Sequence, residues 1–111
     1  MTEVRFALSF ERRLAALSKR YRKIRQDIQP IIDELEKGNF VGDQLSGVSV
    51  TAFKVRAKNS DIPVGKSGGY RLIYQVHSPE SVSLLLIYAK SMQTDASSQE
   101  VERAIQQGLE R

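Results

Sequence analysis

The chain has no cysteine, no tryptophan and a single histidine among its 111 residues. The lack of cysteine excludes disulfides and thiolate chemistry, and with one histidine we expect no transition-metal site built from protein ligands. No apolar run approaches the roughly 20 residues of a membrane-spanning helix, since the longest run centres on residues 84–87. We therefore expect no transition-metal site and no contact with a membrane.

The first residues, Met1 to Phe6, have neither the basic region nor the apolar stretch of a signal peptide. We therefore expect the protein to be cytoplasmic. A chain of 111 residues with 41% hydrophobic residues has the size and composition of one globular unit. We predict a single domain over residues 1–111.

The net charge of +4 is unevenly distributed along the sequence. Residues 50–90 contain six cationic and two anionic side chains, which gives this segment a charge of +4. A second concentration of charge places five cations within residues 19–25. Basic patches are typical of proteins that bind nucleic acid, although the second run also suits a solvated helix face. The candidate contacts in that run are Lys19, Arg20, Arg22 and Lys23.

A row of cations is the main functional signal in the sequence. Lys54, Arg56 and Lys58 alternate with apolar residues in a β-prone run. Successive side chains of a strand point to opposite faces, so these three should project together while the apolar residues are buried. Arg71 comes from the next β-prone run and would lie close to the row in a hairpin. Since we expect no carboxylate nearby, the row predicts a site for a polyanion, most commonly one that carries phosphate.

Hydrophobic periodicity predicts an α+β fold in the order β-α-α-β-β-β-α. We expect a short strand at residues 4–8, with Ser9 as the N-cap of the first helix. An isoleucine-rich stripe over residues 24–35 predicts the second helix, with a kink or a new start at Pro30. Residues 39–49 are polar and contain glycine, so we expect a loop.

Three strands should follow at residues 50–58, 69–77 and 82–90. The run at residues 84–87 is apolar on both faces, which places it inside the sheet under helical cover. Ser97 and Glu100 have the spacing of a capping box, so we expect the last helix to begin there.

Three other motifs have simple structural interpretations. Gly65-Lys66-Ser67 lacks the preceding glycine of a phosphate-binding P-loop, so we expect a hairpin loop whose Lys66 can follow a phosphate backbone. His77 is a general acid–base candidate but lies far along its strand from the cation row. By strand parity Tyr70 and Tyr74 belong to the core, whereas Tyr88 is the better candidate for stacking on bases.

Three segments of the β-prone part of the sequence resemble those of a known family. The segments Phe53–Arg56, Gly65–Val76 and Leu85–Lys90 are similar to the RelE/ParE superfamily of toxin–antitoxin toxins, and most of all to its HigB-like branch. The resemblance implies a small, twisted, mainly antiparallel sheet packed against two N-terminal helices. It also implies a ribosome-dependent mRNA endoribonuclease that uses the 2′-hydroxyl of the RNA as nucleophile and needs no metal or cofactor. The implied partners are the ribosome, mRNA and a cognate antitoxin, expected to be a helix-turn-helix protein.

The resemblance also implies roles for individual residues. The catalytic positions correspond to Lys54, Arg56, Arg71 and Lys90, and the RNA-binding candidates are Lys58, Lys66, Tyr88, Lys19, Arg20, Arg22 and Lys23. Arg71 is expected to hold the scissile phosphate, because a guanidinium offers paired donors of fixed geometry. Lys54 either stabilises charge or takes the proton of the 2′-hydroxyl, and both roles stay open.

The sequence departs from the RelE pattern at two positions. Ser91 stands where RelE has a second arginine, and Ser97 stands near the position of a RelE tyrosine at the start of the following segment. Two alternatives therefore stay open beside cleavage. One is a ParE-like, non-enzymatic inhibitor of DNA gyrase, and the other is a non-cleaving module of the same fold that binds RNA or a protein partner.

Overall fold

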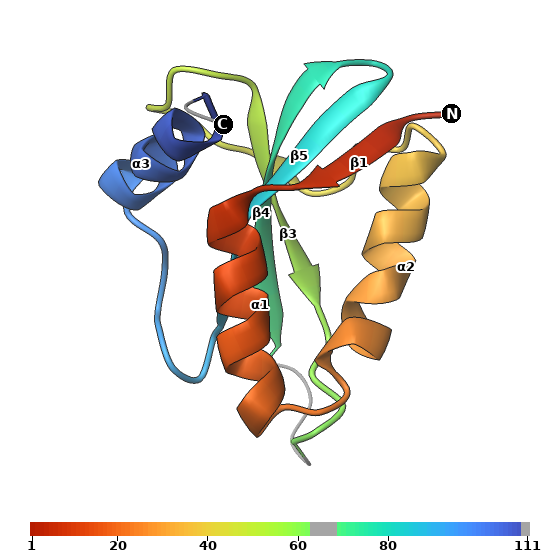
Figure 1. The fold of residues 1–111 in the computed structure, drawn as a ribbon, viewed down its shortest axis with the longest axis vertical. Helices are drawn as coiled ribbons and strands as arrows, with labels where there is room; N and C mark the ends of the chain where they lie inside the picture. The colour runs from red at the N-terminus through yellow and green to blue at the C-terminus, as the bar shows by residue number, and fades with distance from the viewer. Residues whose placement is uncertain (63–68, 110–111) are drawn as a thin grey trace.

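The structure is a computed structural model that describes residues 1–62 and 69–109, and over these residues it contains three helices and a five-stranded mixed sheet (Figure 1). The predicted α+β class is confirmed. In chain order the elements are β1 (Glu3–Phe6), α1 (Leu8–Arg20), α2 (Ile24–Glu36), β2 (Asp43–Gln44), β3 (Ala52–Ala57), β4 (Tyr70–Ser78), β5 (Ser81–Ala89) and α3 (Ser98–Leu109).

The strands lie in the order β1-β5-β4-β3-β2. Three of the four pairings are antiparallel, and β1 pairs with β5 in parallel, with Val4 opposite Val82. The predicted mainly antiparallel sheet is therefore confirmed. β5 lies inside the sheet, as expected from its apolar character on both faces.

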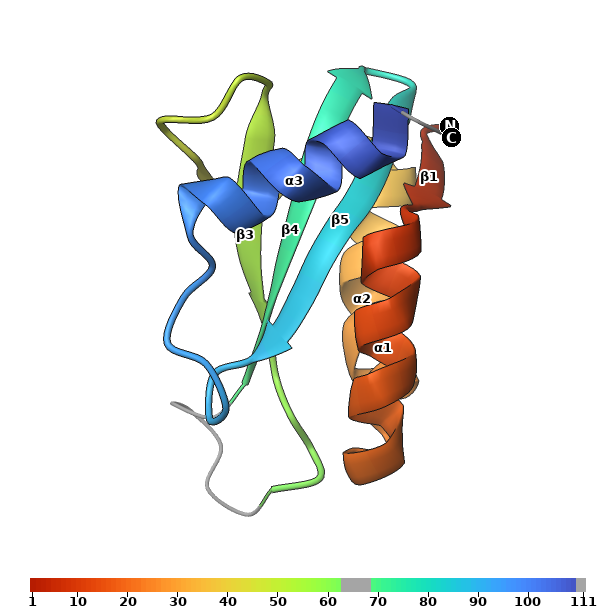
Figure 2. The ribbon, with the colours of Figure 1, turned by 60° about the vertical axis from the view of Figure 1, so that its left-hand side comes forward.

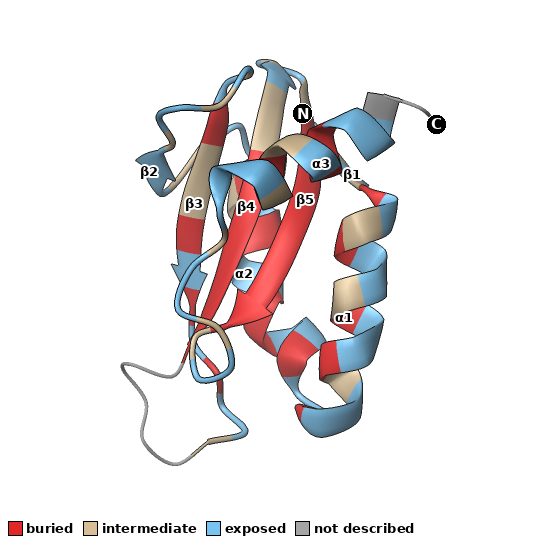
Figure 3. Ribbon diagram, turned by 90° about the vertical axis from the view of Figure 1, so that its left-hand side faces the viewer, coloured by how far each residue is buried: buried red, intermediate tan, exposed pale blue. Residues whose placement is uncertain are grey.

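Helices cover both faces of this sheet (Figure 2). α1 and α2 pack on one face through buried residues of the predicted stripes, including Phe10, Leu14, Ile24, Ile28 and Leu35. α3 crosses the other face and buries Val101, Ala104 and Ile105 against β4 and β5. The coloured ribbon in Figure 3 shows that burial is concentrated on β4 and β5, between the two helical layers.

A bulge in β5 controls which side chains face each layer. Ile73 of β4 is opposite Leu86, whereas the next residue, Tyr74, is opposite Leu84, so Leu85 is an extra residue. Leu85 and Leu86 consequently both contact the α3 layer.

Ser9 is not the N-cap of α1, contrary to the prediction. The N-cap is Ala7, which has no side-chain cap hydrogen bond. The Ser9 hydroxyl instead donates to the carbonyl of Leu85 at 2.7 Å. Because a bulged residue falls outside the regular ladder, its carbonyl needs a partner, and Ser9 supplies one.

α2 continues through Pro30 instead of beginning again there. Proline removes one helical N–H, which costs about 3 kcal/mol in a helix interior. Pro30 is exposed, so the carbonyl that loses its partner can be solvated. The buried stripe on the opposite face of α2 supports the helix on both sides of the proline.

The segment 39–49 was predicted to be a loop, but it contains the short strand β2. Asp43 pairs with Lys54 and Gln44 pairs with Phe53. Two residues are too few for a recognisable alternation, so the pattern gave no strand signal.

The capping box at the start of α3 is confirmed. The backbone N–H of Glu100 donates to the Ser97 hydroxyl at 3.1 Å, and the Ser97 N–H donates to the Glu100 carboxylate at 3.2 Å. No helix in the described part of the chain is long and apolar enough to cross a membrane.

Candidate functional site

A hollow of about 300 Å³ lies on the α3 side of the sheet, near the start of β4 and the end of β5. All four predicted catalytic cations, Lys54, Arg56, Arg71 and Lys90, line it. We call this hollow the cation pocket. Its other lining residues are Asp43, Tyr88, Thr94 and Asp95.

The strand register accounts for the convergence of these side chains. Arg56 of β3 is directly opposite Arg71 of β4, and Arg71 is directly opposite Tyr88 of β5. Lys54 lies two residues from Arg56 on the same face of β3. Like charges directly opposite each other destabilise a sheet. The facing arginines are therefore an arrangement that a bound anion would stabilise.

Arg71 is the most enclosed of the four cations, with 9% of its surface exposed. Its Nη1 donates to the carbonyl of Tyr70 at 3.1 Å. Gly69 lies two residues before Arg71. A Cβ added at Gly69 would lie 2.3 Å from the carbonyl oxygen of Ala57. A glycine is thus required for β3 and β4 to approach each other beside Arg71.

A carboxylate lies among the cations, contrary to the prediction of an acid-free row. Lys54 Nζ lies 3.1 Å from Asp95 Oδ1, and the Tyr88 hydroxyl donates to the same oxygen at 3.0 Å. Asp95 comes from the segment between β5 and α3, where sequence patterns gave no position relative to the sheet. With Asp43 also present, the pocket holds four cations and two carboxylates, a local charge of +2.

The ionisation of two groups follows from this geometry. The hydrogen bond from Lys54 and that from the Ala96 N–H hold the pKa of Asp95 below its usual range. Burial, followed by the hydrogen bond to Asp95, raises the pKa of Tyr88 to about 12. At neutral pH Asp95 is therefore an acceptor, and Tyr88 keeps its proton and acts as a donor.

Tyr88 is buried, with 3% of its surface exposed. Its hydroxyl reaches the pocket, but most of its ring packs with the α3 layer. In this conformation the Tyr88 hydroxyl donates its proton to Asp95, so Tyr88 offers a ligand neither a free donor nor an open face for stacking.

Lys90 is partly exposed at the end of β5. Its Nζ donates to the carbonyl of Thr94 at 2.7 Å, and its backbone N–H donates to the carbonyl of Gly69 at 2.9 Å. These bonds join the segment after β5 to the rim of the cation pocket.

The other candidate residues lie around the pocket. Lys58 is exposed beyond the end of β3 and does not line the pocket, and Lys66 lies outside the described residues. The basic residues Lys19, Arg20, Arg22 and Lys23 are all exposed at the end of α1 and in the turn before α2. The hydroxyls of Tyr21, which lies within this turn, and Ser91 are 3.2 Å apart. The basic turn therefore lies beside the end of β5.

Ser91 and Ser97, where the sequence departs from the RelE pattern, both have structural contacts. Ser91 contacts Tyr21, and Ser97 caps α3. His77, the rejected acid–base candidate, is exposed near the far end of β4 and lies 2.8 Å from the Ser83 hydroxyl. It does not line the cation pocket.

The carboxylates of the pocket do not form a metal site in the described residues. No group of three or more His, Asp or Glu side chains comes together there or elsewhere in residues 1–62 and 69–109. The chemistry available in the pocket is therefore that of cations, one enclosed phenol and two carboxylates.

Asp95→Asn should lower the free energy of unfolding at pH 7, by at most about 1 kcal/mol because this side chain is 62% exposed. The pKa of Asp95 is lower in the folded protein than the usual value of about 4, so the ionised carboxylate stabilises the fold at pH values above about 4. This contribution is lost as the pH falls through the lowered pKa of the folded state. The difference between variant and parent in urea unfolding should thus shrink from pH 7 to pH 3. Asp33→Asn, which removes an exposed carboxylate from α2, is the control. The same pH trend in both variants would contradict this interpretation of the Lys54–Asp95 pair.

Comparison with known proteins leaves the family open. No protein-family model matches the sequence, and no curated protein has significant similarity to it.

Proposed function

We propose that this chain is the toxin of a type II toxin–antitoxin pair and acts as a metal-independent endoribonuclease on mRNA at the ribosome. The observation that carries the proposal is the convergence of Lys54, Arg56, Arg71 and Lys90 in one pocket, from β3, from β4 and from the residue that follows β5. These are also the residues at which the sequence resembles the catalytic positions of the RelE/ParE superfamily. The proposed location is the cytoplasm, and the proposed partners are the ribosome, mRNA and a cognate antitoxin.

In this mechanism the scissile phosphate binds between the facing arginines. The 2′-oxygen of the RNA attacks phosphorus, and the bond from phosphorus to the 5′-oxygen breaks. The products are a 2′,3′-cyclic phosphate and a free 5′-hydroxyl. Arg71, held rigidly under the pocket, stabilises the extra negative charge of the transition state together with Arg56.

Two proton transfers complete the reaction. Asp95 is ionised at neutral pH and can accept the 2′-hydroxyl proton directly, and Lys54, 3.1 Å from it, either stabilises charge or acts as the base itself. Lys90 is the group best placed to protonate the leaving 5′-oxygen, since its ammonium lies on the pocket rim. Tyr88 donates its hydroxyl proton to Asp95, which positions this carboxylate, and it is too weak an acid to lose that proton early.

A second candidate function is RNA binding without cleavage. The observation in its favour is the ion pair between Lys54 and Asp95, which neutralises part of the charge that catalysis would use. Ser91 and Ser97, the two positions that depart from the RelE pattern, make structural contacts. Neither residue replaces the catalytic group that RelE has at that position.

Induced expression should halt translation and produce cuts within translated mRNA, while naked RNA is cut little. Mapping of 5′ ends after induction, with an Arg71→Ala strain as control, measures this directly. Intact messages during growth arrest would contradict cleavage. Accumulated topoisomerase complexes in the same cells would point to the gyrase inhibitor instead, and arrest with neither sign would favour the non-cleaving module.

A further inference from the structure

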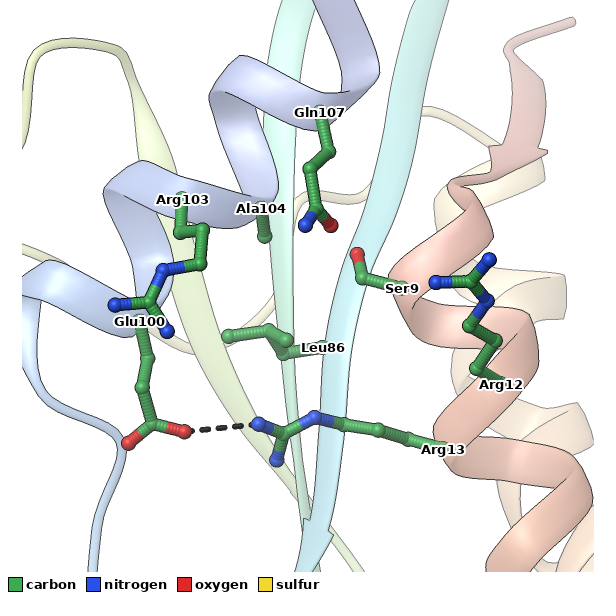
Figure 4. Close-up of a pocket in the computed structure, with 8 residues that line it drawn as sticks. All are labelled: Ser9, Arg12, Arg13, Leu86, Glu100, Arg103, Ala104 and Gln107. Carbon is green, nitrogen blue, oxygen red and sulfur yellow. Dashed lines mark hydrogen bonds and ion pairs between the residues drawn. The ribbon is translucent and has the colours of Figure 1, made fainter.

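A second basic site lies between α1 and α3, apart from the cation pocket (Figure 4). Arg12 and Arg13 come from α1, and Arg103 and Gln107 come from α3. Together with Ser9 and Glu100 they line a cleft of about 240 Å³. The buried side chains of Leu86 and Ala104 also line it, between the two helices. We call it the α1–α3 cleft.

The α1–α3 cleft has a net positive charge. Its three arginines face one carboxylate, Glu100, which leaves a charge of +2. Only Arg13 is paired, at 2.8 Å from Glu100, and within the described residues neither Arg12 nor Arg103 forms an ion pair. Two guanidinium groups from different helices are thus available at one cleft.

The pairing of Arg13 gives the cleft a fixed wall. Glu100 accepts the N–H of Ser97 in the capping box and the guanidinium of Arg13, so one carboxylate ties α1 to the start of α3. These bonds hold the pKa of Glu100 below its usual range, the Ser97 N–H contributing most. Opposite this wall, the amide of Gln107 and the hydroxyl of Ser9 supply neutral polar groups.

A small apolar hollow shares one lining residue with the cleft and one with the cation pocket. Arg13 lines both the cleft and that hollow, and Tyr88 lines both the hollow and the cation pocket. The hollow between them is lined mainly by apolar groups, including Leu17 and the exposed Met92. In a nucleic-acid strand a base lies between successive phosphates, and its apolar surface can pack on the aliphatic side chains of this hollow.

We propose that the α1–α3 cleft is a phosphate-binding site that holds the backbone of a single RNA strand whose neighbouring phosphate occupies the cation pocket. Arg12 and Arg103 bind the phosphate oxygens, and Gln107 adds an amide donor. The RNA part of this inference rests on the proposed function. The phosphate affinity of the cleft does not require cleavage, because none of these residues lines the cation pocket.

The test is the affinity of the full chain for a single-stranded RNA of about 12 nucleotides with 2′-O-methyl groups throughout, so that it cannot be cleaved. We expect Arg12→Gln/Arg103→Gln to weaken binding roughly tenfold at low salt, the loss that accompanies one charge-assisted phosphate contact. The slope of log K against log salt should fall by about 0.7, the value for one phosphate of a single strand. Fluorescence anisotropy over a salt series measures both quantities.

The charge-matched control is Arg5→Gln/Lys37→Gln, which removes two exposed cations that line neither the α1–α3 cleft nor the cation pocket and lie outside the basic run of residues 19–25. This control should change the affinity less than twofold. Equal losses in the two double variants, or no binding of the RNA by the parent protein, would overturn the inference. So would displacement of the RNA by a poly-glutamate peptide at lower concentration than by inorganic pyrophosphate, because the cleft would then prefer an acidic protein partner.

Failure of this inference is distinct from failure of the proposed function. If mRNA stays intact in cells but Arg12→Gln/Arg103→Gln alone weakens RNA binding, the phosphate site in the cleft is supported and the proposed cleavage is rejected. If messages are cut but both double variants bind RNA equally, cleavage stands and the cleft inference falls.

Discussion

Arg71→Ala should lower the rate of RNA cleavage roughly 100-fold or more and relieve growth arrest, which is the scale of loss when one preorganised donor is removed. Arg71 is the enclosed member of the pocket and lies between Arg56 and Tyr88 in the strand register. Its charge is therefore fixed where negative charge develops on the phosphate. Cleavage assays with purified ribosomes and a growth-rescue assay measure the two effects.

Arg71→Lys should restore only part of the activity, since an ammonium keeps the charge but loses the paired donors of the guanidinium. Ribosome binding should change little in either variant, because the basic turn with Lys19, Arg20, Arg22 and Lys23 is unaltered. Arg5→Ala, an exposed change on β1, is the matched control and should stay fully toxic. A folded Arg71→Ala protein of undiminished toxicity, with an unchanged thermal melt, would remove Arg71 from the site.

Leu72→Ala should lower the free energy of unfolding by about 2–5 kcal/mol, the range for a leucine removed from a packed core. Leu72 has no exposed surface and packs on the face of β4 that α1 and α2 cover. Urea unfolding measures the change. The same substitution at Leu8, which is 37% exposed, should cost less than about 1 kcal/mol. Similar losses at the two positions would contradict the assignment of Leu72 to the core.

The features that the sequence predicts well are those with a repeating signal. The isoleucine stripe of α2 recurs with helical spacing, and all of its members are buried as expected. Strand parity correctly separates Tyr70 and Tyr74, which face α1 and α2, from Arg71. The capping box is local in sequence, so the spacing of Ser97 and Glu100 was sufficient to locate the start of α3.

The features that were missed depend on contacts between distant segments. Asp95 has no periodic neighbours, and only the path of the chain after β5 brings its carboxylate to Lys54. Ser9 has the position of an N-cap, but the bulge at Leu85 competes for its hydroxyl. A bulge is one residue inserted in a ladder, and no pattern in the strand itself distinguishes Leu85 from Leu86. The convergence of the four cations could be predicted, but the carboxylates among them could not.

The parallel pairing of β1 with β5 has a consequence for synthesis. Val4 lies opposite Val82, so β1 is synthesised well before β5, the strand with which it pairs. Until then the apolar stripes of α1 and α2 lack the sheet that covers them. The cation pocket likewise needs residues from β3 through Asp95. The pocket therefore cannot form before the segment that follows β5 has been synthesised, whereas β1, α1 and α2 are made well before any ligand can bind there.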